Sequence, residues 1–260
     1  MLIDSHCHLD FADFDAERDE LVERAHASGV KQMVTISTRV RKVDTLLALT
    51  ERYPSVFCSV GTHPNNADEE LDVTADQLVT LAEAHEKIVA IGEAGLDYFY
   101  DTQKPEDQKT GLRRHIEAAR RTQLPLVIHS RSADDDMAEI LTEETGKGAF
   151  PFILHCFSSG QELADTGVAL GGYVSFSGIL TFPKSTELRD IAKTVPMDRL
   201  LVETDAPYLA PKRWRGKRNE PSYVVNTAEV LAEVKGVSYE EIARITTENA
   251  FRCFSKMPQL

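Results

Sequence analysis

Short apolar segments rich in β-branched residues alternate with amphipathic segments along the whole chain, and this alternation constrains the fold most strongly. Eight of the short segments have the length and composition of strands that are covered on both faces. Strands that alternate with helices form right-handed βαβ units, so the order predicts one parallel sheet. The expected strands are residues 2–6, 32–37, 56–61, 88–93, 126–130, 150–155, 172–175 and 200–203.

The segments between these strands carry apolar residues at helical spacing. Residues 105–123, for example, place Leu112, Ile116 and Ala119 on one face, and the pattern stops at Leu124-Pro125. The tail, residues 223–254, predicts helices that close the bottom or the side of the fold. A chain of 260 residues matches a single (β/α)₈ TIM barrel, for which about 250 residues is typical. We therefore expect an α/β TIM barrel that forms a single domain over residues 1–260.

A doubly wound open sheet is the alternative fold. Such a sheet normally carries a glycine-rich phosphate loop after its first strand. In this chain the first expected strand ends in His6-Cys7-His8 instead. This difference favours the closed barrel.

The formal net charge of −13 excludes some classes of function. A surface this acidic argues against wrapping long duplex DNA by counterion release, although bound cations could reverse the sign at one site. No apolar segment approaches the roughly 20 residues of a membrane span, and the first residues do not resemble a secretory signal. The four cysteines form no CxxC pair. We expect a cytoplasmic protein with reduced thiols, no membrane contact and no obligate protein partner.

Five of the eight histidines fall at the carboxyl end of an expected strand. In a barrel these ends converge on one face, where such enzymes have their active sites. The five residues are His6, His8, His63, His129 and His155.

Two carboxylates repeat this placement, because Glu93 ends the fourth expected strand and Asp205 follows the eighth. A charged residue at the end of a buried strand is costly unless a metal or a catalytic role compensates it. In His6-Cys7-His8, the alternation of a strand turns both imidazoles to the same side, where they can reach one cation. The predicted metal ligands are His6, His8, Glu93, His129, His155 and Asp205.

These motifs resemble the TatD deoxyribonuclease family, within the wider group of amidohydrolase-like barrels. The matching segments span nearly the whole chain. They are Asp4-Ser5-His6-Cys7-His8-Leu9, Gly61-Thr62-His63-Pro64, Gly92-Glu93-Ala94-Gly95-Leu96-Asp97, His129-Ser130-Arg131, His155-Cys156-Phe157-Ser158, Glu203-Thr204-Asp205-Ala206-Pro207-Tyr208 and Arg215-Gly216-Lys217-Arg218-Asn219-Glu220-Pro221.

The resemblance implies a site for two divalent metal ions. His6, His8, Glu93 and Asp205 would hold one ion, while Glu93, His129 and His155 would hold the other. The resemblance also implies catalytic roles for Asp205, which would orient or deprotonate water, and for the bridging Glu93. Imidazole-rich ligands favour zinc, nickel or manganese, whereas the nuclease chemistry of the family is associated with magnesium.

The remaining candidates concern the substrate. His63 is expected to contact a substrate phosphate or polarise an oxygen, and the alternative is that it holds a loop. Arg131 is expected to bind substrate through its place in the family motif. The only dense basic cluster, residues 212–218, follows the last expected strand. Its Arg215, Lys217 and Arg218 would contact phosphates, with an aromatic residue suited to a stacked base; the alternative is that the arginines pair with nearby acids.

By this resemblance the chain is a metal-dependent hydrolase acting on ester bonds, a deoxyribonuclease that trims single strands from 3′ to 5′. Its expected partner is DNA or another phosphodiester. The second hypothesis is hydrolysis of an aminoacyl-tRNA ester or of a small-molecule ester or amide, because fold does not fix function. The third is metal storage or a scaffold without turnover, which the placement of Asp205 beside the ligands disfavours.

Overall fold

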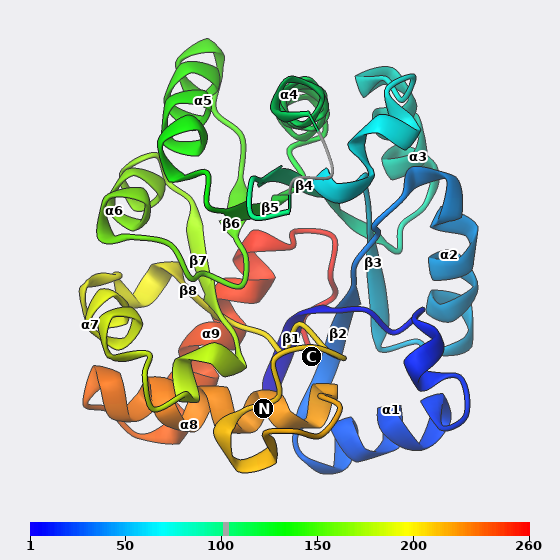
Figure 1. Ribbon diagram of the computed structural model, residues 1–260. Helices are drawn as coiled ribbons and strands as arrows, with labels where there is room; N and C mark the ends of the chain where they lie inside the picture. The colour runs from blue at the N-terminus through cyan, green and yellow to red at the C-terminus, as the bar shows by residue number, and fades with distance from the viewer. Residues whose placement is uncertain (101–103) are drawn as a thin grey trace.

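The computed structural model describes residues 1–100 and 104–260. Eight parallel strands form one sheet in which the spatial order follows the sequence from β1 to β8 (Figure 1). They are β1 (Leu2–Cys7), β2 (Val30–Thr35), β3 (Val56–Val60), β4 (Ile88–Asp97), β5 (Leu126–Arg131), β6 (Phe152–Leu154), β7 (Tyr173–Phe176) and β8 (Leu200–Val202).

The sheet closes between its first strand and the segment that follows its last strand. The backbone N–H of Asp205 donates to the His6 carbonyl at 2.9 Å, and the N–H of His8 donates to the Ala206 carbonyl at 2.8 Å. The (β/α)₈ barrel predicted from the sequence is therefore confirmed, and the open doubly wound sheet is excluded.

Helices surround the strands, and Figure 1 shows α1 to α8 as a ring outside the sheet. The helices are α1 (Arg18–Ala27), α2 (Val43–Arg52), α3 (Ala75–Ala84), α4 (Pro105–Thr122), α5 (Asp134–Lys147), α6 (Gln161–Ala169), α7 (Thr186–Thr194), α8 (Val224–Lys235) and α9 (Tyr239–Cys253). Short 3₁₀ segments lie in several connections, among them η3 (Pro64–Glu70) and η6 (Lys212–Trp214).

Strand β4 runs four residues beyond its predicted end at residue 93. It continues because Gly95, Leu96 and Asp97 pair with β5, after a register shift between Gly92 and Ala94. A close approach of β3 and β4 precedes this extension, since a Cβ atom on Gly61 would lie only 2.4 Å from the Gly92 Cα. This approach places Glu93, the next residue, at the inside of the barrel mouth.

The apolar core has two layers. The larger layer lies between the strands and the surrounding helices, as parallel strands covered on both faces require. The smaller layer fills the barrel near the starts of the strands, where residues such as Ile3, Val127 and Leu201 meet Phe254 and Met257 after the end of α9. The C-terminal tail thus closes the bottom of the barrel, which is one of the two positions expected from the sequence.

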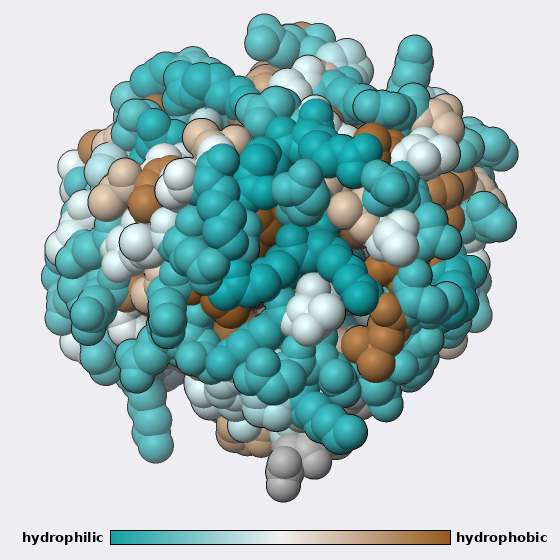
Figure 2. All heavy atoms as spheres, turned by 90° about the horizontal axis from the view of Figure 1, so that it is seen from above, coloured by the Kyte–Doolittle hydropathy of each residue, from teal (hydrophilic) through white to brown (hydrophobic). Residues whose placement is uncertain are grey.

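The outer surface is formed largely by the polar faces of the helices. Figure 2 shows a face that is mostly hydrophilic, with small separate groups of apolar side chains. Within residues 1–100 and 104–260, no helix is both long enough and apolar enough to cross a membrane.

Candidate metal centre

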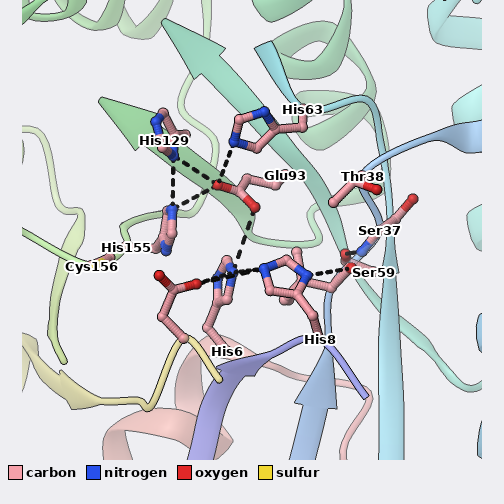
Figure 3. A network of polar contacts seen from close by, with 12 residues as sticks. His6, His8, Ser37, Thr38, Ser59, His63, Glu93, His129, His155 and Cys156 are labelled. Carbon is pink, nitrogen blue, oxygen red and sulfur yellow. Dashed lines mark hydrogen bonds and ion pairs between the residues drawn. The ribbon is translucent and has the colours of Figure 1, made fainter. Parts of the chain in front are cut away.

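The histidines predicted at the strand ends converge at the carboxyl end of the barrel. Figure 3 shows His6 in β1, His8 directly after it, His63 after β3, and His129 and His155 from the region of β5 and β6; His8 is directed toward His6, and the other four toward Glu93. The β-barrel geometry explains this convergence, because each side chain leaves its strand at the same level of the barrel.

The first group of side chains surrounds one point near the end of β1. The His6 Nε2 atom lies 3.3 Å from His8 Nε2, 3.5 Å from Glu93 Oε2 and 3.6 Å from Asp205 Oδ1. The His8 Nε2 atom lies 3.5 Å from the same Asp205 oxygen. Four donors at the corners of a tetrahedron, each about 2.1 Å from a cation, would be roughly 3.4 Å apart. The spacing of these four side chains therefore fits a transition-metal ion.

The second group lies on the other side of Glu93. The Glu93 Oε1 atom is 2.7 Å from His155 Nε2 and 2.9 Å from His129 Nδ1, and these two nitrogens are 3.3 Å apart. The two oxygens of one carboxylate therefore face two different groups of nitrogen donors. A carboxylate in this position can bridge two cations.

His63 is close to both groups, but its hydrogen bonds give it a different role. Its Nδ1 atom accepts the backbone N–H of Asn65 at 3.1 Å, so the neutral ring carries its proton on Nε2. That Nε2 atom lies 3.5 Å from Glu93 Oε1. Burial lowers the pKa of His63 to about 4, which keeps the ring neutral at pH 7. His63 therefore presents an N–H donor to the site rather than a lone pair.

The electrostatics of the centre favour cation binding. Burial alone would raise the pKa of Glu93, but the positive charge available on His155, together with the hydrogen bonds from His129 and His155, outweighs it and holds the pKa well below its usual value. Burial, reinforced by His155, lowers the pKa of His6 well below its usual value. The His6 and His155 rings are stacked with centroids 4.0 Å apart. An ionised carboxylate beside a neutral imidazole is the pair that a divalent cation requires.

Two carboxylates behind the histidines were not predicted in the roles that the structure gives them. Glu203 accepts from the Nδ1 atom of His155 at 3.2 Å and from the backbone N–H of Cys156 at 2.8 Å. Asp97 lies 3.2 Å from the Nε2 atom of His129, whereas the sequence analysis named it only as the last residue of a family motif.

A third buried acid, Asp4, joins the two strands that close the barrel. It accepts from the backbone N–H of Thr204 at 2.9 Å and from the Thr204 hydroxyl at 2.6 Å. Burial raises the pKa of Asp4 to about 8. A charged residue within the apolar first strand is the signal that could have singled out Asp4.

The basic cluster, residues 212–218, is largely engaged within the protein. Arg218 donates to Glu17 at 2.6 Å and to the Asp13 carbonyl at 2.5 Å. The indole of Trp214 stacks on Tyr223 at 4.6 Å between centroids and donates to Asn226. Direct substrate contact by Arg218 and base stacking on Trp214 thus conflict with the contacts that these side chains already make.

Arg215 and Lys217 remain exposed in the same cluster. Arg215 lies over the Phe182 ring and Lys217 over the Trp214 ring, with cation-to-centroid distances of 4.7 and 5.3 Å. Both cations can still reach a phosphate, because neither forms an ion pair with a described carboxylate.

Arg131 lies on the wall of an open groove of about 820 Å³ that begins at Ser130, next to His129. Its guanidinium is 3.8 Å from the centroid of Phe99, a ring that is 57% exposed. The groove offers space for a substrate beside the metal centre, and its lining also includes the three aspartates that begin α5.

The comparison with known proteins decides the family. A family model described as TatD related DNase matches residues 3–255. The chain belongs to the TatD family. It is 42% identical over 256 residues to the uncharacterized metal-dependent hydrolase YabD of Bacillus subtilis (strain 168), which covers 98% of this chain and 99% of the relative.

Other members of the TatD family agree with this assignment. The chain is 42% identical to the uncharacterized metal-dependent hydrolase YcfH of Escherichia coli (strain K12), over 97% of this chain and 95% of the relative. The crystal structure of YJJV, a TatD homologue from Escherichia coli K12, superimposes with a TM-score of 0.91 at 31% identity and covers 99% of this chain and 98% of that chain. The protein is therefore a metal-dependent hydrolase of the TatD family.

Proposed function

We propose that this TatD-family hydrolase is a deoxyribonuclease that holds two divalent cations and trims single strands from 3′ to 5′. The observation that carries the proposal is the position of Glu93, whose Oε2 atom faces His6 while its Oε1 atom faces His129 and His155. Glu93 is only 2% exposed, so both oxygens are directed inward. In this assignment His6, His8, Glu93 and Asp205 bind one ion, and Glu93, His129 and His155 bind the other.

When bound, two divalent cations activate water and neutralise the charge that develops on the attacking and leaving oxygens. The protein's own groups then supply the proton transfer and the orientation. Asp205 is the most accessible carboxylate of the centre, with 14% of its side chain exposed, so it can accept a proton from an attacking water. The Nε2–H group of His63 can donate a hydrogen bond to a phosphoryl oxygen and stabilise its added charge.

Residues outside the centre would bind the rest of the strand. Arg131 beside its groove and the exposed Arg215 and Lys217 can bind phosphates that the acidic body of the protein cannot hold. Arg218 would act indirectly, because its ion pair with Glu17 ties the basic cluster to α1. The imidazole-rich donor set favours zinc, nickel or manganese, and the Glu93 and Asp205 oxygens also suit magnesium.

Hydrolysis of an aminoacyl-tRNA ester or a smaller ester is the second candidate. The observation that favours it is the internal engagement of Trp214 and Arg218, which removes two contacts along a bound DNA strand, whereas an ester at the end of a tRNA or on a small molecule needs only the metal centre.

The test offers the metal-free protein four divalent ions in turn, namely magnesium, manganese, zinc and nickel, with three substrates. The substrates are a single-stranded oligonucleotide labelled at its 5′ end, the matching duplex and an aminoacyl-tRNA. We expect the labelled single strand to shorten stepwise from its 3′ end only when metal is added. Cleavage of the aminoacyl ester without cleavage of either DNA would favour the second candidate.

The double variant Arg215→Ala with Lys217→Ala then tests the nucleic-acid contacts. Each lost phosphate contact should flatten the salt dependence of binding to a single strand by about 0.7 units of slope, so KM for the oligonucleotide should rise. A minimal chromogenic phosphodiester, which does not reach the cluster, serves as the control and should be cleaved normally. A variant that binds oligonucleotides like the parent at every salt concentration would remove the cluster from the proposal.

A further inference from the structure

Each histidine of the centre has an outer ring nitrogen, which faces away from Glu93. The hydrogen bond of this outer nitrogen determines whether the inner nitrogen has a lone pair free to bind a cation. A ligating histidine usually donates its outer N–H to a carboxylate, a carbonyl or water, which fixes the tautomer and raises the basicity of the inner nitrogen. In this protein the histidines of the second group both meet a carboxylate. His155 donates from Nδ1 to Glu203, and His129 donates from Nε2 to Asp97, each at 3.2 Å.

Within the described part of the chain, the histidines of the first group have no carboxylate behind them that accepts a hydrogen bond. The Nδ1 atom of His8 lies 3.2 Å from the backbone carbonyl of Ile36, which carries no net charge. The Nδ1 atom of His6 is buried and has no hydrogen-bond partner among the residues that the structure describes. Glu203 also has an oxygen within 4.8 Å of a His6 nitrogen, but no hydrogen bond joins the two side chains, so hydrogen-bonded carboxylate support is confined to one of the two groups that share Glu93.

We propose that Glu203 and Asp97 are positioning residues for the second cation alone. This inference rests on the two-ion centre proposed above. Each carboxylate keeps a proton on the outer nitrogen of its histidine, so that the lone pair of the inner nitrogen points toward Glu93 Oε1. The first cation, held by His6, His8, Glu93 and Asp205, does not depend on either carboxylate.

Both carboxylates are held firmly enough for this role. The Glu203 side chain is fully buried and the Asp97 side chain is 1% exposed. Asp97 also accepts the backbone N–H groups of Phe99 and Tyr100 on Oδ1, while Gln108 donates to its backbone carbonyl. Asp97 cannot turn away from His129 without breaking the bonds from Phe99 and Tyr100, and Glu203 cannot turn away from His155 without losing the bond from the Cys156 N–H.

The two carboxylates differ in how many of their hydrogen bonds an amide side chain could keep. The hydrogen bonds that Glu203 accepts from His155 and Cys156 both end on Oε1, so the carbonyl oxygen of Gln could keep both and lose only the charge. Asp97 meets donors on both oxygens, since His129 and Asn65 face Oδ2 while Phe99 and Tyr100 face Oδ1. An Asn amide must point its own N–H groups at one of these pairs. Asp97→Asn should therefore harm the second ion more than Glu203→Gln.

The experiment measures metal binding directly, without reference to activity. Metal-free wild type, Glu203→Gln and Asp97→Asn are titrated with Co²⁺, followed by visible absorption, and the bound metal is counted by elemental analysis after dialysis. Loss of such outer carboxylates typically weakens metal binding 10–100-fold. We expect affinity for the second ion to fall about 10-fold in Glu203→Gln and about 100-fold in Asp97→Asn, with the first ion unchanged.

Glu144→Gln is the matched control. Glu144 is a buried carboxylate held by Arg113, Arg120 and Lys147, and it contacts no histidine of the centre. This variant should bind both ions like the wild type. Thermal unfolding of each metal-free variant shows whether it is folded, and Glu203→Gln carries the test alone if Asp97→Asn does not fold.

The outcomes separate this inference from the proposed function. A wild type that binds fewer than two Co²⁺ ions would overturn the two-ion centre and the inference with it. A wild type that binds two ions, combined with variants that keep the second at full affinity, would overturn the inference alone. Equal weakening of both ions would also overturn it, because it would mean that the carboxylates support the whole centre.

Discussion

The two ends of the barrel are built from opposite kinds of residue, although both are buried. At the bottom, the second residue of each strand is mostly apolar, and Phe254 and Met257 fill the space between them. At the top, histidines and carboxylates take the corresponding positions, with Glu93 at their centre. The bottom can stabilise the fold by excluding water, whereas the buried polar groups at the top are costly unless a cation compensates them. We therefore expect substitutions at the top to alter metal binding and turnover, and substitutions at the bottom to alter the free energy of unfolding.

Removal of the shared carboxylate at the top should have the largest effect. Glu93→Ala deletes the one group that faces both sets of nitrogen donors, so we expect both ions to be lost and turnover to be abolished. Elemental analysis of protein purified without chelator, together with hydrolysis of a chromogenic phosphodiester, measures both effects. Normal metal content in this variant would contradict the role of Glu93, because the top would then bind cations without its carboxylate.

A smaller change at the top should separate chemistry from metal binding. Asp205→Asn keeps the shape and one oxygen but removes the basic oxygen beside His6 and His8. Loss of a general base usually costs about 10²–10⁴-fold in rate, so turnover should fall within this range while metal content falls less. The readout is kcat at saturating metal, with the metal count as its control. Activity within tenfold of the wild type would point to another base.

The bottom should respond in stability rather than in chemistry. Phe254 is fully buried in the plug, and Phe254→Ala should lower the free energy of unfolding by about 3–5 kcal/mol through the cavity that it leaves. Urea unfolding measures this loss, and the folded variant should keep its metal content and kcat. Phe251→Ala is the control, since Phe251 packs on the plug while only partly buried and should cost less. Equal losses in both variants would contradict a specific plug.

The smallest effect is a pH dependence of stability that His115 contributes near the loop after β3. His115 accepts the backbone N–H of Thr62 on Nε2 and donates from Nδ1 to the Gly111 carbonyl, so its neutral form is bound on both sides. Burial lowers its pKa from 6.5 to about 4. Because the unfolded chain takes up the proton first, stability is complete above pH 6.5 and is lost as the pH falls toward 4, by about 3 kcal/mol in all.

Urea unfolding between pH 7 and pH 4 tests this dependence with His115→Gln as the comparison. The Gln side chain does not titrate, so its free energy of unfolding should vary less with pH than that of the wild type. Parallel pH profiles would show that other groups carry the acid sensitivity. The apolar cluster around Phe254 contains no histidine and no carboxylate among the described residues, so Phe254→Ala should leave the pH profile between pH 7 and pH 4 parallel to the wild type.

The sequence alone determined the architecture and the place of the site. Alternating strand and helix patterns predicted the barrel because their hydrophobic periods are local properties of the chain. The same patterns placed His6, His129 and Glu93 at strand ends, and the topology of a parallel barrel brings such ends together. The prediction agreed with the structure where a feature depends on contacts within one element or between neighbouring strands.

The side chains that support the site, and those that are engaged elsewhere, became evident from contacts between elements that are distant in the sequence. The support of His155 by Glu203 and of His129 by Asp97 joins residues that are 48 and 32 positions apart. Arg218 looked like a phosphate ligand in the sequence, yet it pairs with Glu17, 201 positions away. Composition and spacing record which charges exist, but the partner of each charge depends on distances between separate elements. Those distances are set by barrel closure and helix packing, which no local pattern specifies.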